Sequence, residues 1–164
     1  MTKSNFPFRI GLGHDTHRLM EGTEITLGGV CIPFESSLVG HSDADVLLHA
    51  ITDALLGAAA IGDIGDLFPD NDPVNRGRSS VEMLQIAYKQ VRRKGFALVN
   101  LDCIVFAEKP KLGSLKQAIR QRLAEILEVE PDQVSLKAKT GEKVGPIGRL
   151  EAIEAEAIAL LQHR

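Results

Sequence analysis

The segment from residue 41 to residue 66, HSDADVLLHAITDALLGAAAIGDIGD, constrains the fold more than any other part of the sequence. Its apolar residues recur at the spacing of an amphipathic helix, and they outnumber the polar ones. Ser42 is a natural N-cap residue, and Asp45 follows three positions later in a variant of the capping box. The pattern therefore predicts a largely buried helix that begins near Asp43.

Three polar residues interrupt the apolar character of this helix. Asp45, His49 and Asp53 follow one another in steps of four, which places an imidazole between two carboxylates on one face. A buried histidine that forms a hydrogen bond with Asp53 would explain this pattern without any function. A metal ligand would explain it as well, provided that further donors arrive from elsewhere in the chain.

Such donors follow an apolar strand pattern near the N-terminus, in the sequence GHDTH at residues 13–17. Alternate residues of an extended chain point to the same side, so Asp15 and His17 can face one point. Together with His49 they form a set of two histidines and one carboxylate. This set suits catalytic zinc with an open fourth position, and it also suits non-haem Fe(II).

Composition narrows the class of protein. The chain has 164 residues, 44% of them hydrophobic, and no Trp, which predicts a single domain over residues 1–164 with an aliphatic core and residues 1–7 as a flexible extension. A formal charge of −3 and the lack of a basic run argue against nucleic acid or a membrane surface as partner. Cys31 and Cys103 lack metal-type spacing, and no leader or spanning segment is evident, so we expect a cytoplasmic protein that binds a small molecule.

The remaining patterns predict alternating strands and helices. Strands are expected at residues 9–12, 101–107 and 134–140, a hairpin at 23–34 with its turn at Gly28 and Gly29, and helices at 77–94, 114–127 and 150–162. Three loops carry candidate polar groups: the loop at 62–73 with Asp63 between two glycines, the loop at 107–113 with two lysines, and the glycine-rich loop at 140–149. No residue of the 77–94 helix is expected to take part in a site.

Four motifs together resemble the 2-C-methyl-D-erythritol 2,4-cyclodiphosphate synthase family: GHDTHRL at 13–19, the segment 41–70, AEKPKLG at 107–113 and KAKTGEKVGPIGR at 137–149. The resemblance implies an α+β fold, a two-layer α/β sandwich with a mixed four-stranded sheet plus a hairpin and helices on one face. It also implies a homotrimer round a three-fold axis, with active sites between subunits.

The resemblance implies a reaction of the non-mevalonate isoprenoid pathway. The 2-phosphate of 4-diphosphocytidyl-2-C-methyl-D-erythritol 2-phosphate attacks the β-phosphorus, CMP leaves, and the cyclodiphosphate forms, so the enzyme is a phosphorus-oxygen lyase. By the same resemblance, Asp15, His17 and His49 would hold Zn²⁺ or another divalent transition metal. Glu142 would hold Mg²⁺ or Mn²⁺ with the substrate diphosphate, and His41 and Thr140 would stabilise the transition state.

The family's substrate contacts carry over to three groups of positions in this chain. Around the phosphates and methylerythritol these are Asp15, His17, His41, Ser42, Asp63, Ile64, Gly65, Phe68, Pro69, Asp70, Asn71 and Asp72. Around cytidine and the diphosphate they are Ala107, Glu108, Lys109, Pro110, Lys111, Leu112, Gly113, Lys139, Thr140, Gly141 and Glu142. In the final loop they are Pro146 and Arg149, where Pro146 replaces a frequent Phe, and Lys139 and Gly141 replace threonines of many members.

Two other classes of protein are compatible with the residues alone. An Fe(II) oxygenase would use the same two histidines and one carboxylate. A non-enzymatic trimeric module that binds a nucleotide or an isoprenoid diphosphate would not need His49 as a ligand. Metal content and oxygen-dependent turnover separate these classes from the synthase.

Overall fold

A computed structural model of the chain describes residues 6–40, 42–69 and 71–164. Its main sheet has five strands in the order β4-β1-β7-β5-β6, so the expected count of four is wrong. The strands are β1 (Phe8–Glu21), β4 (Ser36–Leu38), β5 (Phe96–Phe106), β6 (Val134–Lys139) and β7 (Ala152–His163). The sheet is mixed as predicted, because β5 and β6 are parallel whereas the other pairs are antiparallel.

A separate two-stranded hairpin joins β2 (Glu24–Leu27) to β3 (Val30–Pro33), as the sequence predicts. Its turn residues Gly28 and Gly29 have φ angles of 61° and 75°. Two successive residues in the left-handed region give the tight turn that matches the twist of the strands, and glycine adopts this conformation without a steric penalty.

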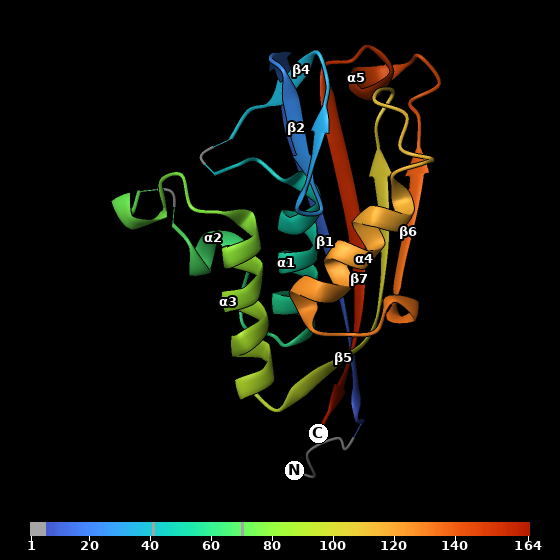
Figure 1. Cartoon of the computed structure of the whole chain (residues 1–164). Coiled ribbons are helices and arrows are strands. Elements are labelled where there is room, and N and C mark those ends of the chain that lie inside the picture. Colours follow the sequence, from blue (N-terminus) through green and yellow to red (C-terminus); the bar gives the residue numbers. More distant parts are fainter. Residues whose placement is uncertain (1–5, 41, 70) are drawn as a thin grey trace.

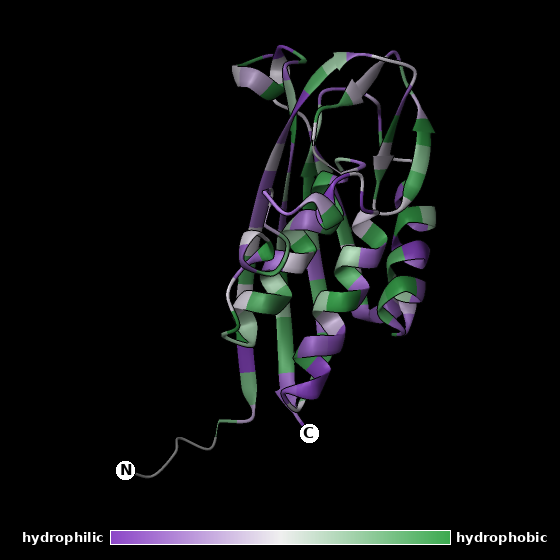
Figure 2. Ribbon diagram, turned by 90° about the vertical axis from the view of Figure 1, so that its left-hand side faces the viewer, coloured by the Kyte–Doolittle hydropathy of each residue, from purple (hydrophilic) through white to green (hydrophobic). Residues whose placement is uncertain are grey.

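Three long helices lie over one face of the sheet: α1 (Val46–Ala58), α3 (Ser80–Arg93) and α4 (Lys116–Leu127) (Figure 1). Figure 2, turned by 90°, shows the same two layers from the side. Shorter turns of helix are α2 (Ile64–Leu67), η1 (Pro73–Asn75), η2 (Pro131–Gln133) and α5 (Gly145–Gly148). The core between the layers consists almost entirely of Leu, Ile, Val and Ala, as the composition predicts.

Helix α1 begins three residues later than the expected start near Asp43, because Asp45 rather than Ser42 is its N-cap. The Asp45 side chain accepts a hydrogen bond from the Leu48 N–H at 3.1 Å. The Ser42 hydroxyl accepts one from the Ala44 N–H instead. Ten of the thirteen residues of α1 are buried, which explains its apolar sequence.

Glycines in β1 allow α1 to lie directly against this strand. A Cβ atom on Gly11 would lie 1.9 Å from the carbonyl oxygen of Ala54, and one on Gly13 would lie 1.8 Å from that of Ala50. Larger residues at these positions would push the helix away from the strand. The two glycines therefore set the short distance across which groups on α1 and β1 meet.

The C-terminal segment is the main error of the sequence prediction. Residues 150–162 were expected to form a helix, but β7 (Ala152–His163) is a strand that pairs with both β1 and β5. Its buried residues alternate with less buried ones from Ile153 to Leu161. This is the period of a strand with one face on the core.

In the described part of the chain, the three long helices leave the other face of the sheet uncovered. Ile10, Leu12 and Ile158 are 73%, 66% and 47% exposed there, and Leu12 lies directly opposite Ile158 in the ladder. Of the expected flexible extension, residues 1–5 lie outside the described residues, whereas Pro7 accepts a hydrogen bond from the His163 N–H. None of the helices in the described ranges is long and apolar enough to cross a membrane.

Candidate metal centre and substrate pockets

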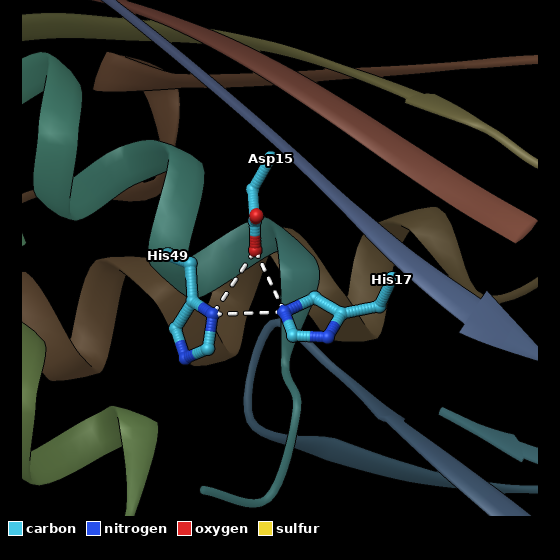
Figure 3. A group of neighbouring side chains, drawn as sticks. All are labelled: Asp15, His17 and His49. Carbon is cyan, nitrogen blue, oxygen red and sulfur yellow. Dashed lines mark hydrogen bonds and ion pairs between the residues drawn. The ribbon is translucent and has the colours of Figure 1, made fainter. Parts of the chain in front are cut away.

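Asp15, His17 and His49 meet at one point between β1 and α1 (Figure 3). Asp15 Oδ2 lies 2.8 Å from His17 Nε2 and 3.0 Å from His49 Nδ1, and the two nitrogens lie 3.1 Å apart. Asp15 and His17 share one side of β1, as the two-residue spacing predicts. The structure thus brings together the three side chains that the sequence singled out.

The outer ring nitrogens of both histidines have partners of their own. His17 Nδ1 lies 2.6 Å from the Val39 carbonyl oxygen, to which it donates, and His49 Nε2 lies 2.8 Å from Ser80 Oγ. With a metal ion bound, donation from these outer nitrogens would leave a lone pair for the metal on each nitrogen that now faces Asp15. Two neutral imidazoles and one carboxylate that converge in this way fit a divalent transition metal.

The hydrogen bond between His49 and Asp53 that the sequence suggested is not formed. Asp53 accepts a hydrogen bond from the Ile64 N–H at 2.7 Å, whereas the His49 ring is bonded to Asp15 and to serine hydroxyls. The second carboxylate, Asp45, does not flank the imidazole either, since its oxygens accept backbone N–H groups. Asp45 thus caps the start of α1, and Asp53 joins the middle of α1 to the start of α2.

The electrostatics of the three converging groups favour an ionised carboxylate. Burial alone would raise the pKa of Asp15, but hydrogen bonds to His17 and His49 and the charge of the imidazoles outweigh it and hold the pKa well below its usual range. Burial alone would lower the pKa of His17, but the hydrogen bonds to Asp15 and to the Val39 carbonyl raise it above its ordinary value. Asp15 is therefore a permanent anion at neutral pH.

A cavity of about 470 Å³ opens beside these three residues. It is lined by Asp15, His17, Val39, Gly40, Ser42, His49, Ile64, Gly65, Phe68, Asn75 and Met83. Ser42, Ile64, Gly65 and Phe68 thus lie where the sequence expected substrate contacts. The expected contacts His41 and Asp70 lie outside the described residues.

Two of the expected acidic contacts have structural roles at helix ends. The Asp63 side chain accepts the Asp66 N–H at 2.9 Å and forms a capping box with Asp66 at the start of α2. The Asp72 side chain accepts the Val74 N–H at 3.0 Å at the start of η1. Pro69 and Asn71 are exposed. These caps account for Asp63, Asp66 and Asp72 of the loop at 62–73.

A second cavity, of about 310 Å³, holds most of the expected cytidine contacts. It is lined by Ala107, Pro110, Lys111, Leu112, Gly113, Lys116, Ala138, Lys139 and Thr140. Glu108 joins the two loops around it, because its carboxylate accepts the Gly141 N–H at 3.1 Å. Lys109 is exposed, and Thr140 donates to Glu142 at 2.8 Å. No described residue lines both this cavity and the first one.

The last two expected contacts lie apart from both cavities. Pro146 lines a further pocket with Thr16, Arg18 and Leu150. Arg149 is exposed and forms a two-pronged ion pair with Glu151, at 2.8 and 3.2 Å. Neither residue lines the cavity beside the three converging donors.

Sequence reasoning missed two polar residues next to His49. Ser80 is fully buried, and its hydroxyl contacts His49 Nε2 and the Asp43 carboxylate. From the sequence, Asp43 is expected only at the start of a helix, and no site residue is expected in the 77–94 helix that contains Ser80. Asn75 and Met83 in the cavity wall were missed as well. No sequence pattern could have indicated the contact between Ser80 and His49, because it becomes visible only in the structure.

Comparisons with known proteins agree on one family. Residues 8–162 match the YgbB family. The 2-C-methyl-D-erythritol 2,4-cyclodiphosphate synthase of Solibacter usitatus is 53% identical over 154 residues, which cover 94% of this chain and 97% of the relative. Among solved structures, the bifunctional IspDF of Campylobacter jejuni superposes with a TM-score of 0.93 at 41% identity over 98% of this chain and 43% of its own. The CDP complex of IspF from Plasmodium falciparum superposes with a TM-score of 0.85 at 35% identity, over 98% of this chain and 99% of its own.

The family match spans nearly the whole described fold, including the strand β1 that carries Asp15 and His17 and the helix α1 that carries His49. The identity to the synthases is high enough, and the coverage of both chains complete enough, that more than the fold is shared. The chain therefore belongs to the YgbB family of 2-C-methyl-D-erythritol 2,4-cyclodiphosphate synthases, enzymes of the non-mevalonate isoprenoid pathway.

Proposed function

We propose that this chain carries out its family's reaction by metal-assisted intramolecular phosphoryl transfer, as a phosphorus-oxygen lyase. The 2-phosphate of 4-diphosphocytidyl-2-C-methyl-D-erythritol 2-phosphate forms a bond to the β-phosphorus, and the bond from that phosphorus to CMP breaks. No water or oxidant is consumed. The observation that carries the proposal is the convergence of Asp15, His17 and His49 within about 3 Å of one another beside an open cavity.

The chain's own residues have to fold the substrate and neutralise its charge. A phosphate monoester is mostly dianionic at neutral pH, since its second pKa is about 6, so the attacking group needs no base. Orientation of two reacting groups contributes up to roughly 7–11 kcal/mol in well-aligned intramolecular reactions. Ser42 and the exposed backbone around Gly65 line the cavity and would hold the 2-phosphate and the methylerythritol, together with Asp63 and the segment 68–72.

Asp15, His17 and His49 would hold Zn²⁺ or another divalent transition metal. Such an ion, when bound, supplies Lewis-acid stabilisation of charge on the phosphoryl oxygens. The orientation of both outer ring nitrogens toward acceptors, with lone pairs facing inward, supports this assignment. Glu142 would hold Mg²⁺ or Mn²⁺ together with the diphosphate, since that ion prefers one or two carboxylates plus phosphate oxygens.

Thr140 and His41 are proposed to stabilise the transition state through hydrogen bonds to the phosphoryl oxygens. Thr140 donates to Glu142 from the loop that follows β6, so one loop presents both groups. The cavity formed by residues 107–113 and 138–140 would receive cytidine. A related protein from Plasmodium falciparum is described as a CDP complex, which supports a cytidine nucleotide as the ligand of this cavity.

We propose that the active form is a homotrimer. The cavity beside Asp15, His17 and His49 and the cavity of residues 107–113 and 138–140 share no described residue, which supports a site completed between neighbouring copies. The uncovered sheet face, with exposed Ile10, Leu12 and Ile158, offers an apolar surface for that contact. The trimer predicts three times the mass of one chain in light scattering, and a monomer that turns over substrate would contradict it.

The unpaired cysteines Cys31 and Cys103 support a cytoplasmic location for this enzyme.

Phosphorus NMR of the cytidine-linked substrate tests the reaction. With Mg²⁺, the purified protein should release CMP and a cyclic diphosphate in equal amounts, and a chelator should abolish both products. The His49→Ala variant should remain folded, lose zinc and form neither product. Zinc-loaded trimer that releases no CMP would refute the proposed reaction, whereas stoichiometric zinc in His49→Ala would remove His49 from the ligands.

A further inference from the structure

The side of His49 that faces away from Asp15 is held by a short chain of polar groups. We propose that Ser80 and Asp43 are positioning residues for the metal ligand His49, and that they fix the tautomer and the orientation of its ring. This inference rests on the proposed metal site at Asp15, His17 and His49. It assigns a role in metal binding to two residues that contact neither the proposed metal nor the cavity.

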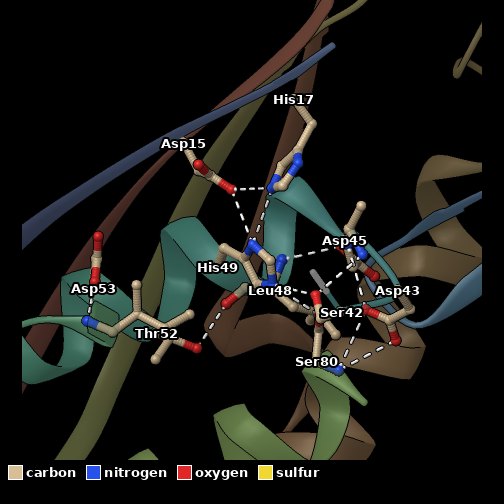
Figure 4. Close-up of polar contacts among 12 residues, drawn as sticks. Asp15, His17, Ser42, Asp43, Asp45, Leu48, His49, Thr52, Asp53 and Ser80 are labelled. Atoms are coloured by element: carbon tan, nitrogen blue, oxygen red, sulfur yellow. Dashed lines mark hydrogen bonds and ion pairs between the residues drawn. The ribbon is translucent and has the colours of Figure 1, made fainter. Parts of the chain in front are cut away.

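The contacts form a continuous path from the imidazole to a carboxylate (Figure 4). His49 Nε2 lies 2.8 Å from Ser80 Oγ. The Ser80 hydroxyl donates to Asp43 Oδ1, and the Ser80 N–H points at the same carboxylate, 3.2 Å from Oδ2. The Asp43 carboxylate thus holds both the side chain and the backbone N–H of Ser80.

The direction of each hydrogen bond follows from the chemistry of the groups. A carboxylate only accepts hydrogen bonds, so the hydroxyl proton of Ser80 points toward Asp43. The lone pairs of Ser80 Oγ then accept the N–H of His49 Nε2. A neutral imidazole with its proton on Nε2 has its lone pair on Nδ1, the atom that lies 3.0 Å from Asp15.

The other histidine is oriented by the same principle with a different partner. His17 Nδ1 donates to the Val39 carbonyl at 2.6 Å, which leaves Nε2 free to face Asp15. A carbonyl can only accept, so it fixes the tautomer by itself. A hydroxyl can donate or accept, and therefore Ser80 specifies the tautomer of His49 only because Asp43 takes its proton.

Burial makes this orientation effective. Ser80 is completely buried at the first residue of α3, so water does not compete for its hydroxyl. Ser42 Oγ lies 3.2 Å from His49 Nε2 and 3.3 Å from Ser80 Oγ, and it is a weaker partner at these distances. Loss of the Ser80 hydroxyl would leave His49 Nε2 with this longer contact alone.

The test compares zinc affinities of Ser80→Ala, Asp43→Ala and a matched control. Ser79→Ala is the control, because Ser79 is the adjacent exposed serine and its side chain makes no capping hydrogen bond. Zinc affinity is measured on metal-free protein by competition with a chromophoric chelator, and the thermal midpoint is measured on the same samples. Ser80→Ala should lose about 10- to 100-fold in zinc affinity, the usual effect of removing a group that orients a ligand. Ser79→Ala should match the unmodified protein.

Asp43→Ala provides a second measurement if Ser80→Ala does not fold, since Asp43 is exposed and its substitution adds no cavity to the core. Asp43→Ala should weaken zinc binding, as Ser80→Ala does. The absorption spectrum of the Co²⁺-substituted protein should change in both variants, whereas a purely structural role would lower the thermal midpoint and leave affinity and spectrum as they were.

Unchanged zinc affinity in both variants would overturn the positioning role while leaving the proposed metal site intact. If the unmodified protein bound no zinc, or if His49→Ala bound it as tightly, the metal site itself would fail, and the positioning role with it. These two failures are distinguishable because His49→Ala and Ser80→Ala are measured side by side.

Discussion

Removal of the Asp45 carboxylate should destabilise the fold strongly, although Asp45 touches no ligand. Its side chain is fully buried and joins the start of α1 to the turn of the β2–β3 hairpin. Oδ1 accepts the Gly28 N–H at 2.9 Å and the Leu48 N–H at 3.1 Å, and Oδ2 accepts the Gly29 N–H at 2.7 Å. Burial raises the pKa of Asp45 to about 6 despite these three donors, so the group is mostly ionised at pH 7.

The expected loss for Asp45→Ala can be worked from these contacts. Loss of the N-cap bond to Leu48 costs about 1 kcal/mol. The buried N–H of Gly28 is left without a partner, which costs about 1–3 kcal/mol, and the partly buried N–H of Gly29 adds about 1 kcal/mol. The total is about 3–5 kcal/mol, which at about 2–4 °C per kcal/mol for a domain of this size lowers the thermal midpoint by roughly 10 °C.

This loss of stability is measured by urea unfolding of the metal-free protein, with every variant at the same protein concentration. The control is Asp72→Ala, which removes an exposed cap with a single bond to Val74 and should cost no more than about 1 kcal/mol. Asp45→Asn should lie between the two, because its amide oxygen can keep the bonds of Oδ1 while its NH₂ group faces the Gly29 N–H. If Asp45→Ala is no less stable than Asp72→Ala, the three N–H bonds do not hold the hairpin to α1.

Three further predictions concern packing, pH and the second metal. Gly13→Ala should destabilise the chain by about 1–3 kcal/mol, because its Cβ would meet the Ala50 carbonyl. Gly57→Ala is the control, since Gly57 has open space around it and the substitution should stabilise α1 by about 0.5–1 kcal/mol. Equal midpoints of urea unfolding for the two variants would contradict the close packing of β1 on α1. The pKa of His17 is raised above 6.5, and zinc binds only the neutral ring. The apparent zinc affinity should therefore rise with pH, by up to about tenfold per pH unit, until the pH exceeds that pKa. A zinc affinity that does not change with pH in zinc titrations would refute this. Glu142→Gln should keep zinc but need more Mg²⁺ for turnover, and an unchanged Mg²⁺ dependence would argue against its role.

The sequence predicted most elements of the fold, and its main failure has a clear physical cause. Strand β7 is rich in Ala, Glu and Leu, which favour helices in isolation. It lies in the middle of the sheet between β1 and β5, where hydrogen bonds on both edges override this preference. Alternation was present from Ile153 to Leu161, but small residues such as alanine give a weak hydrophobic signal.

The candidate metal site was predictable because each of its three residues obeys a local rule. Two-residue spacing places Asp15 and His17 on one side of β1, and a capped apolar helix presents His49. The meeting of strand and helix depends on Gly11 and Gly13, whose role is visible only when the distance to α1 is known. The sequence also could not predict how most of the other expected substrate contacts divide between two cavities. That division depends on where β5 and β6 lie in the sheet relative to β1.

The start of α3 shows why local rules could not find Ser80. A serine pair before a helix predicts a side-chain cap, yet Ser79, the N-cap, makes no such bond. The N–H of Ser80 is satisfied by Asp43, which arrives from the segment before α1. With its backbone partner supplied from another part of the chain, Ser80 does not have to cap its own helix. Its hydroxyl contacts Asp43 and His49, so the residue that joins α3 to the candidate metal site finds its partners outside its own helix, where no local pattern indicates them.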